Sequence, residues 1–411
     1  MNNNLTSEEI RKLTKKRWLI LVISCLINLC IGSMYAWSAL AAPMAGTLGV
    51  DPSEMGVVFS CSNAVGFITM IIGGLLNDKY GPKWVMFVGG VMFGVGMFTC
   101  GYALNVGHLI LSYGLCLGLG LSMVYGCTIS NTIKFFPDKR GMVGGMTTAF
   151  YGISSVIFAP LGSAMCDAIG PRTTFMVLGA IFVVVICVGS LLMIKCPVGF
   201  VPEGYVPPVQ TATKKNNDKT PVEMLKSPVF YVMLVMLTAG GTFGLMIIST
   251  AKTVAVNMVN AGASAAVLVS VLCLFNTAGR LIAGVLSDKL GRINTLTAAL
   301  VIALGGLGLL IAASSTESMT AFVVGIILIG ICFGTFMGVF PGFSTDQFGQ
   351  KNNTVNYGIM WIGFSIAGIA GPTILNKIYM ASGSYVMAFV IAIFIAVVGL
   401  VMSFVYRKIA R

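Results

Sequence analysis

The residue with the clearest chemical potential is Arg280, which lies in the middle of the apolar stretch 267–286. Inserting an arginine at the centre of a membrane-spanning helix costs about 2.5 to 3.5 kcal/mol, so we expect the chain to give it an anion or a water-filled cavity. A guanidinium binds a carboxylate through two parallel hydrogen bonds and stays protonated at physiological pH. Asn276 lies one helical turn earlier on the same face and could bond the same ligand. The sequence thus predicts an anion site, the alternative being an arginine held by carbonyl groups at helix ends.

The composition places this arginine in an all-α polytopic membrane protein. Of 411 residues, 57% are hydrophobic and 9% charged, and the mean hydropathy is +0.94. Only helices are expected to cross the bilayer, because lipid cannot satisfy backbone polar groups and the alternation typical of barrel strands is absent. Apolar runs of about 20 residues predict spans at 18–42, 54–76, 83–103, 108–131, 142–166, 172–194, 228–250, 262–286, 294–313, 318–342, 354–376 and 385–406. Arg280 then lies roughly 12 Å from the inner membrane edge, near the midplane.

The net charge of +12 indicates topology and no nucleic-acid partner. Of the 25 basic residues, only Arg172, Lys252 and Lys377 fall in segments on the side opposite the N-terminus, and Arg280 falls within a span. This bias is the one that the positive-inside rule describes, so we expect a multi-pass protein of the cell (inner) membrane with both termini in the cytoplasm. The 11 cysteines are scattered through the spans, and the single histidine, His108, is expected at the edge of an outer loop.

A repeated segment divides the chain into two halves. The stretch 74–83 follows the second span and 284–292 follows the eighth, and both contain Gly, Leu, Asp, Lys and Gly in the same order. We predict a duplicated six-helix unit: a cytoplasmic segment 1–17, a bundle 18–194, a proline-containing linker 195–227, a second bundle 228–406 and a tail 407–411. Each aspartate could pair with a basic group of a neighbouring helix, or the loop could be only a tight turn. The signature residues are Gly74, Asp78, Lys79, Gly81, Gly284, Asp288, Lys289 and Gly291.

These loops resemble the signature loop of the major facilitator superfamily, and the predicted spans and central linker agree with that fold. The residues that carry a finer resemblance are Tyr35–Ser38 with Pro43, Tyr125-Gly126, Phe136–Gly141, Phe275–Arg280, and Asn356–Gly358 with Trp361. They are similar to the oxalate:formate antiporter family and, more widely, to monocarboxylate carriers. The resemblance implies a secondary carrier of organic anions that works by alternating access, with Arg280 as the carboxylate anchor.

One departure from that family narrows the expected substrate. Oxalate exchangers resembling this chain have a second cation in span 11, where this sequence has Phe364. A dianion facing one guanidinium would leave charge unpaired at a cost of several kcal/mol. We therefore predict a small monocarboxylate such as lactate, pyruvate, acetate or formate, with an oxalate:formate-type dicarboxylate exchanger as the alternative.

Aromatic side chains are the remaining candidates for the substrate site. Tyr35, Tyr125, Tyr151 and Trp361 could line a polar cavity, and ordinary helix packing is the competing interpretation for each. Phe333, Met337 and Phe364 are expected to set the size and dryness of the pocket.

The remaining polar residues bear on the coupling and on the competing function classes. All 13 acidic residues fall in loops or at span ends, so proton symport would need a rim acid such as Asp51, Glu54, Asp167 or Glu317, or a protonated substrate, whereas anion exchange needs none. A multidrug exporter is disfavoured because a buried arginine repels cations, and a nutrient sensor because no soluble domain is appended. No catalytic triad, nucleotide loop or metal-ligand cluster is apparent, so we expect no enzymatic activity, metal or cofactor. We also expect the protein to be a monomer.

Overall fold

Every element in the described part of the chain is helical, and most of the long helices coincide with the apolar runs of the sequence. The computed structural model describes residues 6–51, 54–205 and 218–410. The elements up to the linker are α1 (Ser7–Ile31), the 3-10 helix η1 (Gly32–Ala36), α2 (Trp37–Leu48), α3 (Met55–Ala64), α4 (Gly66–Tyr80), α5 (Pro82–Thr99), η3 (Cys100–Tyr102), α6 (Val106–Leu109), the π-helix η4 (Ile110–Leu117), α7 (Gly118–Phe135), α8 (Arg140–Ile169) and α9 (Pro171–Leu192). The later elements are α10 (Pro221–Leu225), α11 (Pro228–Ile248), α12 (Ala251–Val259), η5 (Gly262–Ser264), α13 (Ala265–Leu290), α14 (Arg292–Thr316), α15 (Met319–Phe348), α16 (Asn353–Ser382) and α17 (Val386–Ile409).

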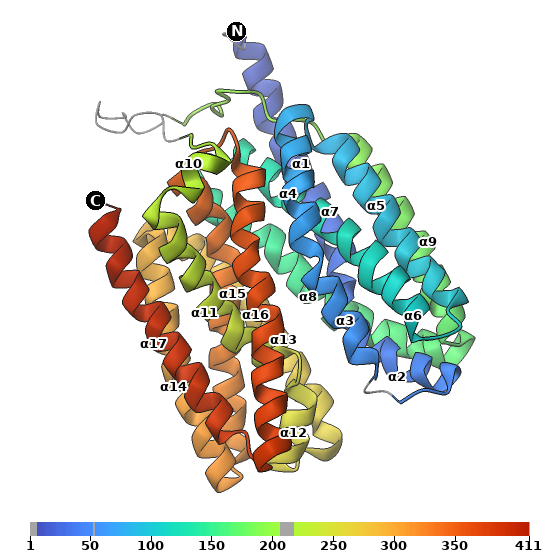
Figure 1. Ribbon diagram of the computed structural model, residues 1–411. Coiled ribbons are helices and arrows are strands. Elements are labelled where there is room, and N and C mark those ends of the chain that lie inside the picture. Colours follow the sequence, from blue (N-terminus) through green and yellow to red (C-terminus); the bar gives the residue numbers. More distant parts are fainter. Residues whose placement is uncertain (1–5, 52–53, 206–217, 411) are drawn as a thin grey trace. The chain divides into compact units, whose positions relative to one another are not determined.

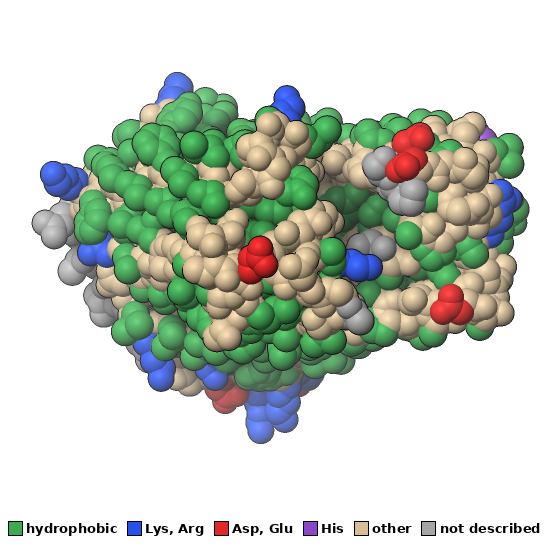
Figure 2. Space-filling model, turned by 90° about the horizontal axis from the view of Figure 1, so that it is seen from below, with side chains coloured by type: hydrophobic (Ala, Val, Ile, Leu, Met, Phe, Trp, Pro, Cys, Tyr) green, Lys and Arg blue, Asp and Glu red, His purple; other side chains and the backbone are tan. Residues whose placement is uncertain are grey.

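Within the described residues, 12 helical segments are long and apolar enough to cross a membrane, which confirms the all-α polytopic prediction. Many of their apolar side chains are exposed, as expected for helices whose outer faces contact lipid. Figure 2 shows one face of the molecule, where hydrophobic side chains cover much of the surface and acidic ones are few. The protein is therefore a multi-pass membrane protein.

The chain forms two compact units. Unit 1 comprises Met1–Pro221 with Ser344–Ile359, and unit 2 comprises Val222–Phe343 with Met360–Arg411. In unit 1, α5 lies beside both α7 and α9, and in unit 2, α17 lies beside α11 and α14 (Figure 1). The predicted division into two six-helix bundles joined by a linker stays a prediction, and most of the polar tract 211–220 lies outside the described residues.

The first span differs from the predicted run 18–42. Helix α1 begins at Ser7 because Thr6 and Glu9 form a capping box, in which each side chain bonds the other residue's backbone N–H. The helix then tightens into η1 at Gly32, where an added Cβ would collide with the carbonyl oxygen of Tyr151. This close approach of α8 leaves no room for a side chain at position 32, and Tyr35 lies beside Tyr151 of α8.

Several glycines mark close contacts between helices. A Cβ on Gly118 of α7 would lie 2.7 Å from the backbone of Ser62 in α3. A Cβ on Gly94 of α5 would collide with Val183 of α9. Small residues at these positions let the backbones of neighbouring helices touch, which supplies packing that the hydrophobic effect cannot supply inside lipid.

Candidate functional site

Arg280 is positioned by a glycine ridge on the neighbouring helix. A Cβ on Gly338 of α15 would lie 2.6 Å from the carbonyl oxygen of Arg280, and one on Gly334 would collide with the carbonyl oxygen of Asn276. Helix α13 therefore packs backbone to backbone against α15 at the level of both polar residues. Arg280 is 1% exposed and Asn276 is also buried, so the guanidinium is not directed at lipid. Its Nε donates a long hydrogen bond of 3.4 Å to Asn276 Oδ1, one helical turn earlier, so the two side chains lie on the same face of α13.

A row of stacked aromatic side chains in unit 2 begins beside this arginine. The guanidinium carbon lies 6.0 Å from the ring centroid of Phe333 on α15. Phe333 in turn stacks on Phe364 of α16 at 6.4 Å, and Phe364 stacks on Trp361 at 4.3 Å. Met337, one turn after Phe333, is buried as well. The structure thus brings together the predicted residues of unit 2 as one cation beside an apolar, aromatic wall, an environment that strengthens any ion pair formed there.

The predicted tyrosines gather separately in unit 1. The rings of Tyr35 and Tyr151 lie 5.2 Å apart edge to face, and Tyr125 lies 5.0 Å from Tyr151. Tyr125 and Tyr151 are buried and Tyr35 is half-buried. Three helical elements, η1, α7 and α8, therefore contribute one phenol each to a single cluster.

A polar strip between α1 and α7 was not predicted from the sequence. Ser24 and Thr132 hydroxyls lie 2.7 Å apart, and Asn28 Nδ2 donates to Thr128 Oγ1 at 3.0 Å. All four side chains are buried, and Asn28 Oδ1 has no hydrogen-bond partner among the described residues. The polar residues are spaced four apart on each helix, which is the one sequence pattern that could have predicted this strip. Single hydroxyl and amide residues are too common in membrane helices for that pattern to identify which helices are in contact.

The aspartate of the first signature loop, Asp78 at the end of α4, contacts the start of α16, and both segments belong to unit 1. Asp78 Oδ1 accepts a bond from Lys134 Nζ at 2.8 Å, and its two oxygens accept from Thr354 Oγ1 and from the backbone N–H groups of Thr354 and Val355 at 2.8 to 3.1 Å. A Cβ on Gly74 would lie 2.7 Å from the backbone of Val355, which explains the glycine one turn before the aspartate. The carboxylate acts as a cap on the first turn of α16, the helix that carries Trp361 and Phe364.

The second signature loop repeats the turn with other partners. Gly81 and Gly291 both have positive φ, 95° and 86°, and each ends one helix and begins the next. Asp288 forms an ion pair of 2.7 Å with Arg292, four residues later, and the same guanidinium donates to Ser287 Oγ. The shared residues therefore specify the turn, whereas the partners of each aspartate depend on the residues outside the shared motif.

Two further ion pairs secure the ends of unit 1. Arg17 binds Asp138 through both terminal nitrogens, at 2.7 and 3.2 Å, with its guanidinium over the ring of Phe136. Arg140 pairs with Asp346 at 2.7 Å. The sequence analysis identified Phe136–Gly141 as a characteristic segment, but it did not predict the charged partners of Asp138 and Arg140. Among the described residues, Arg17 and Arg280 are the charged side chains that are buried, and the acids are at least partly exposed.

Several known proteins related to this chain are transporters. Its sequence matches the family described as Major Facilitator Superfamily over residues 21–372. It is 30% identical to the oxalate:formate antiporter of Oxalobacter formigenes, with 90% of this chain and 87% of that protein covered. It is also 30% identical to an uncharacterized MFS-type transporter, YhjX, of Escherichia coli, with 86% of each chain covered. Monocarboxylate transporter 9 of Gallus gallus is 26% identical over 43% of this chain and 35% of its own length.

The fold agrees with these relatives. A solved structure of the transporter FucP in the outward conformation aligns with a TM-score of 0.69 over 94% of this chain and 98% of that one, at 14% identity. Spans, signature loops and relatives thus lead to one assignment: the chain belongs to the major facilitator superfamily, as a transporter related to the oxalate:formate antiporter and the monocarboxylate transporters.

Proposed function

We propose that this transporter carries a small monocarboxylate anion by alternating access and that Arg280 binds the carboxylate. The observation that carries the proposal is the buried guanidinium of Arg280 beside an aromatic wall of Phe333, Phe364 and Trp361. In such a setting a carboxylate gains two charge-assisted hydrogen bonds, and one positive charge balances one negative charge. Asn276, bonded to Arg280, is placed to bond a hydroxyl, a keto oxygen or the second carboxylate oxygen.

Phe364 favours a monoanion over a dianion. Family resemblance implies a cation at this position in oxalate exchangers, and here a ring stacked on Trp361 occupies it. The second carboxylate of oxalate would face an apolar surface, which costs several kcal/mol in order of magnitude. The 30% identity to an oxalate:formate antiporter keeps dicarboxylate exchange as the second candidate.

The remaining elements have supporting roles in this proposal. Tyr35, Tyr125 and Tyr151 contribute polar aromatic surface, and the loops around Asp78 and Asp288 control helix ends during the cycle. We infer cytoplasmic termini and residence in the cell membrane from the distribution of basic residues. The rim acids Asp51, Glu54, Asp167 and Glu317 are exposed, and no acidic residue in the described ranges is buried. Proton symport would therefore use a rim acid or a protonated substrate, whereas anion exchange needs neither.

Uptake into proteoliposomes tests the substrate. Labelled lactate, pyruvate, acetate, formate and oxalate are offered to the unmodified protein and to Arg280→Lys, Arg172→Lys and Phe364→Lys. We expect a monocarboxylate to be preferred, Arg280→Lys to reduce uptake to background because an ammonium cannot reproduce the two-pronged contact, and Arg172→Lys to retain it. Phe364→Lys should shift preference toward oxalate. Preference for oxalate in the unmodified protein contradicts the monoanion assignment.

The same vesicles separate the two coupling modes. An imposed pH gradient drives symport, whereas preloaded internal anion drives exchange. Uptake that responds to the internal anion and ignores the pH gradient identifies an exchanger.

A further inference from the structure

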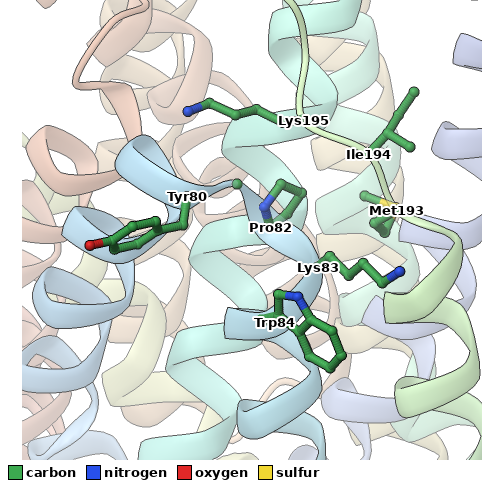
Figure 3. A pocket seen from close by; sticks show the side chains of 8 residues that line it. Tyr80, Pro82, Lys83, Trp84, Met193, Ile194 and Lys195 are labelled. Carbon is green, nitrogen blue, oxygen red and sulfur yellow. The ribbon is translucent and has the colours of Figure 1, made fainter.

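A pocket of about 280 Å³ lies at the first signature junction and shares no lining residue with the proposed substrate site. Its wall is formed by Tyr80 at the end of α4, by Gly81 to Trp84 at the start of α5, and by Met193 to Lys195 after α9 (Figure 3). These elements all belong to unit 1 and all border the ends of predicted membrane spans. The volume is slightly below that of most small-molecule sites, so it suits a compact headgroup and not a large ligand.

The charged side chains of this wall are lysines. Lys83 and Lys195 extend on either side of Pro82 in Figure 3, and both are exposed. Lys195 Nζ donates to the carbonyl oxygens of Asp78 and Lys79 at 2.9 and 2.8 Å, which fixes the ammonium at the rim and leaves one of its three donors for a ligand. The Asp78 carboxylate is bound to Lys134 and the first turn of α16, so it does not neutralise the pocket. The site is therefore complementary to an anion.

Aromatic and apolar surfaces continue from the pocket onto the flank of unit 1. Tyr80 is 67% exposed and Trp84 is 63% exposed, although both are large amphipathic side chains. One turn further into the spans, Leu76 on α4 and Val88 on α5 are exposed as well. Tyrosine and tryptophan are typical of the membrane interface, and aliphatic side chains are typical of the lipid-facing surface below it. An anion held by the lysines would thus have room for acyl chains along the same face.

The second junction has the same turn without these features. Leu290 stands where the first copy has Tyr80, and Ile293 and Asn294 stand where it has Lys83 and Trp84. Arg292 is bound to Asp288 and Ser287. The signature turn by itself does not require a basic, aromatic pocket. The basic and aromatic residues at the first junction therefore need a separate explanation.

We propose that the pocket at Tyr80–Trp84 and Met193–Lys195 binds the phosphate of an anionic phospholipid headgroup. The phosphate lies between the two lysines, Trp84 and Tyr80 flank the headgroup, and the acyl chains follow the exposed flank of α4 and α5. Basic pockets between helices at a membrane surface are suited to this chemistry, and the cytoplasmic leaflet supplies anionic lipids.

Native mass spectrometry of the full-length purified chain in detergent tests this proposal. Phosphatidylglycerol is titrated against phosphatidylcholine with the same acyl chains, and the bound fraction of each is measured. Each basic residue near a membrane surface contributes about 1 kcal/mol, or about fivefold in affinity, so Lys83→Gln/Lys195→Gln should weaken phosphatidylglycerol binding about 25-fold. Phosphatidylcholine should bind weakly to both proteins.

Three controls make each result decisive. The variant Lys289→Gln/Lys408→Gln removes the same charge from exposed positions outside the pocket and should bind like the unmodified chain. Lys83→Arg/Lys195→Arg should retain binding, which separates loss of charge from loss of folding. Inorganic phosphate at millimolar concentration should displace little lipid. Unchanged binding in the double glutamine variant, equal binding of the two lipids, or complete displacement by inorganic phosphate would each overturn the lipid site.

Discussion

Asp78 and Asp288 occupy the same place in two copies of one turn, and their carboxylates bind different partners. Asp78 reaches across to Lys134 on α7 and to the first turn of α16, and its side chain is 8% exposed. Asp288 pairs with Arg292 in the next helix of its own junction, and its side chain is 24% exposed. The second copy has an arginine where the first has Pro82, so only the second aspartate has a cation four residues later.

This difference teaches that a repeated motif can specify a backbone turn without specifying an interaction. In the first copy the capped helix is α16, whose residues Trp361 and Phe364 lie two to three turns after the cap. A contact at the end of the span is thereby connected through one continuous helix to the aromatic wall beside Arg280. In the second copy, the ion pair of Asp288 and Arg292 joins the adjacent helices α13 and α14.

Neutralising the two aspartates should therefore have unequal effects. We expect Asp78→Asn to lower the free energy of unfolding by about 3 kcal/mol, because Lys134 keeps its charge in a nearly buried position without a counterion. Asp288→Asn should cost about 1 kcal/mol or less, because the side chain of Asp288 is 24% exposed, against 8% for Asp78, and its interaction with Arg292 is screened by solvent. Denaturant unfolding in mixed micelles measures both, and equal losses would show that the α16 cap adds nothing.

Replacing the two turn glycines should have nearly equal effects, both smaller than that of Asp78→Asn. Gly81→Ala and Gly291→Ala each force a Cβ into the left-handed region, at about 1 to 2 kcal/mol. Gly81→Ala should be the more costly of the two, since its Cβ would also lie 3.0 Å from Lys195 Cβ. Gly308→Ala on α14 serves as the control: nothing lies within 4 Å of an added Cβ there, and the helix should gain up to about 1 kcal/mol. Thermal unfolding of the three variants side by side gives the order.

The sequence predicted the helices well because membrane insertion depends on local apolar length. The burial of Arg280 was also predictable from its place in an apolar span, and the location of Asn276 on the same helix face from their spacing of four residues. The partners of Asp78 on α16 were not, since Thr354 and Val355 lie far away in the sequence and two of their three hydrogen bonds come from backbone N–H groups. The extra helix α12 was missed because its nine residues are too short and too polar to register as a span. Long-range contacts made by backbone atoms leave no residue pattern to detect.

The segment Met193–Cys196 provides a last and smaller contrast between the junctions, because it covers only the first. Asn131 on α7 bonds both the Ile194 carbonyl oxygen and the Cys196 N–H, and burial raises the pKa of the Cys196 thiol to about 12, with Lys134 opposing that shift. A thiol with a pKa near 12 is almost entirely protonated at pH 8, and only the thiolate reacts. We expect maleimide labelling of Cys196, followed by peptide mass spectrometry, to be slow at pH 7 to 8 and to rise about tenfold per pH unit up to pH 10. A cysteine introduced as Lys289→Cys at the exposed second junction should instead label rapidly and level off near pH 9. Equal labelling at the two positions would mean that the segment after α9 leaves the first junction open to solvent.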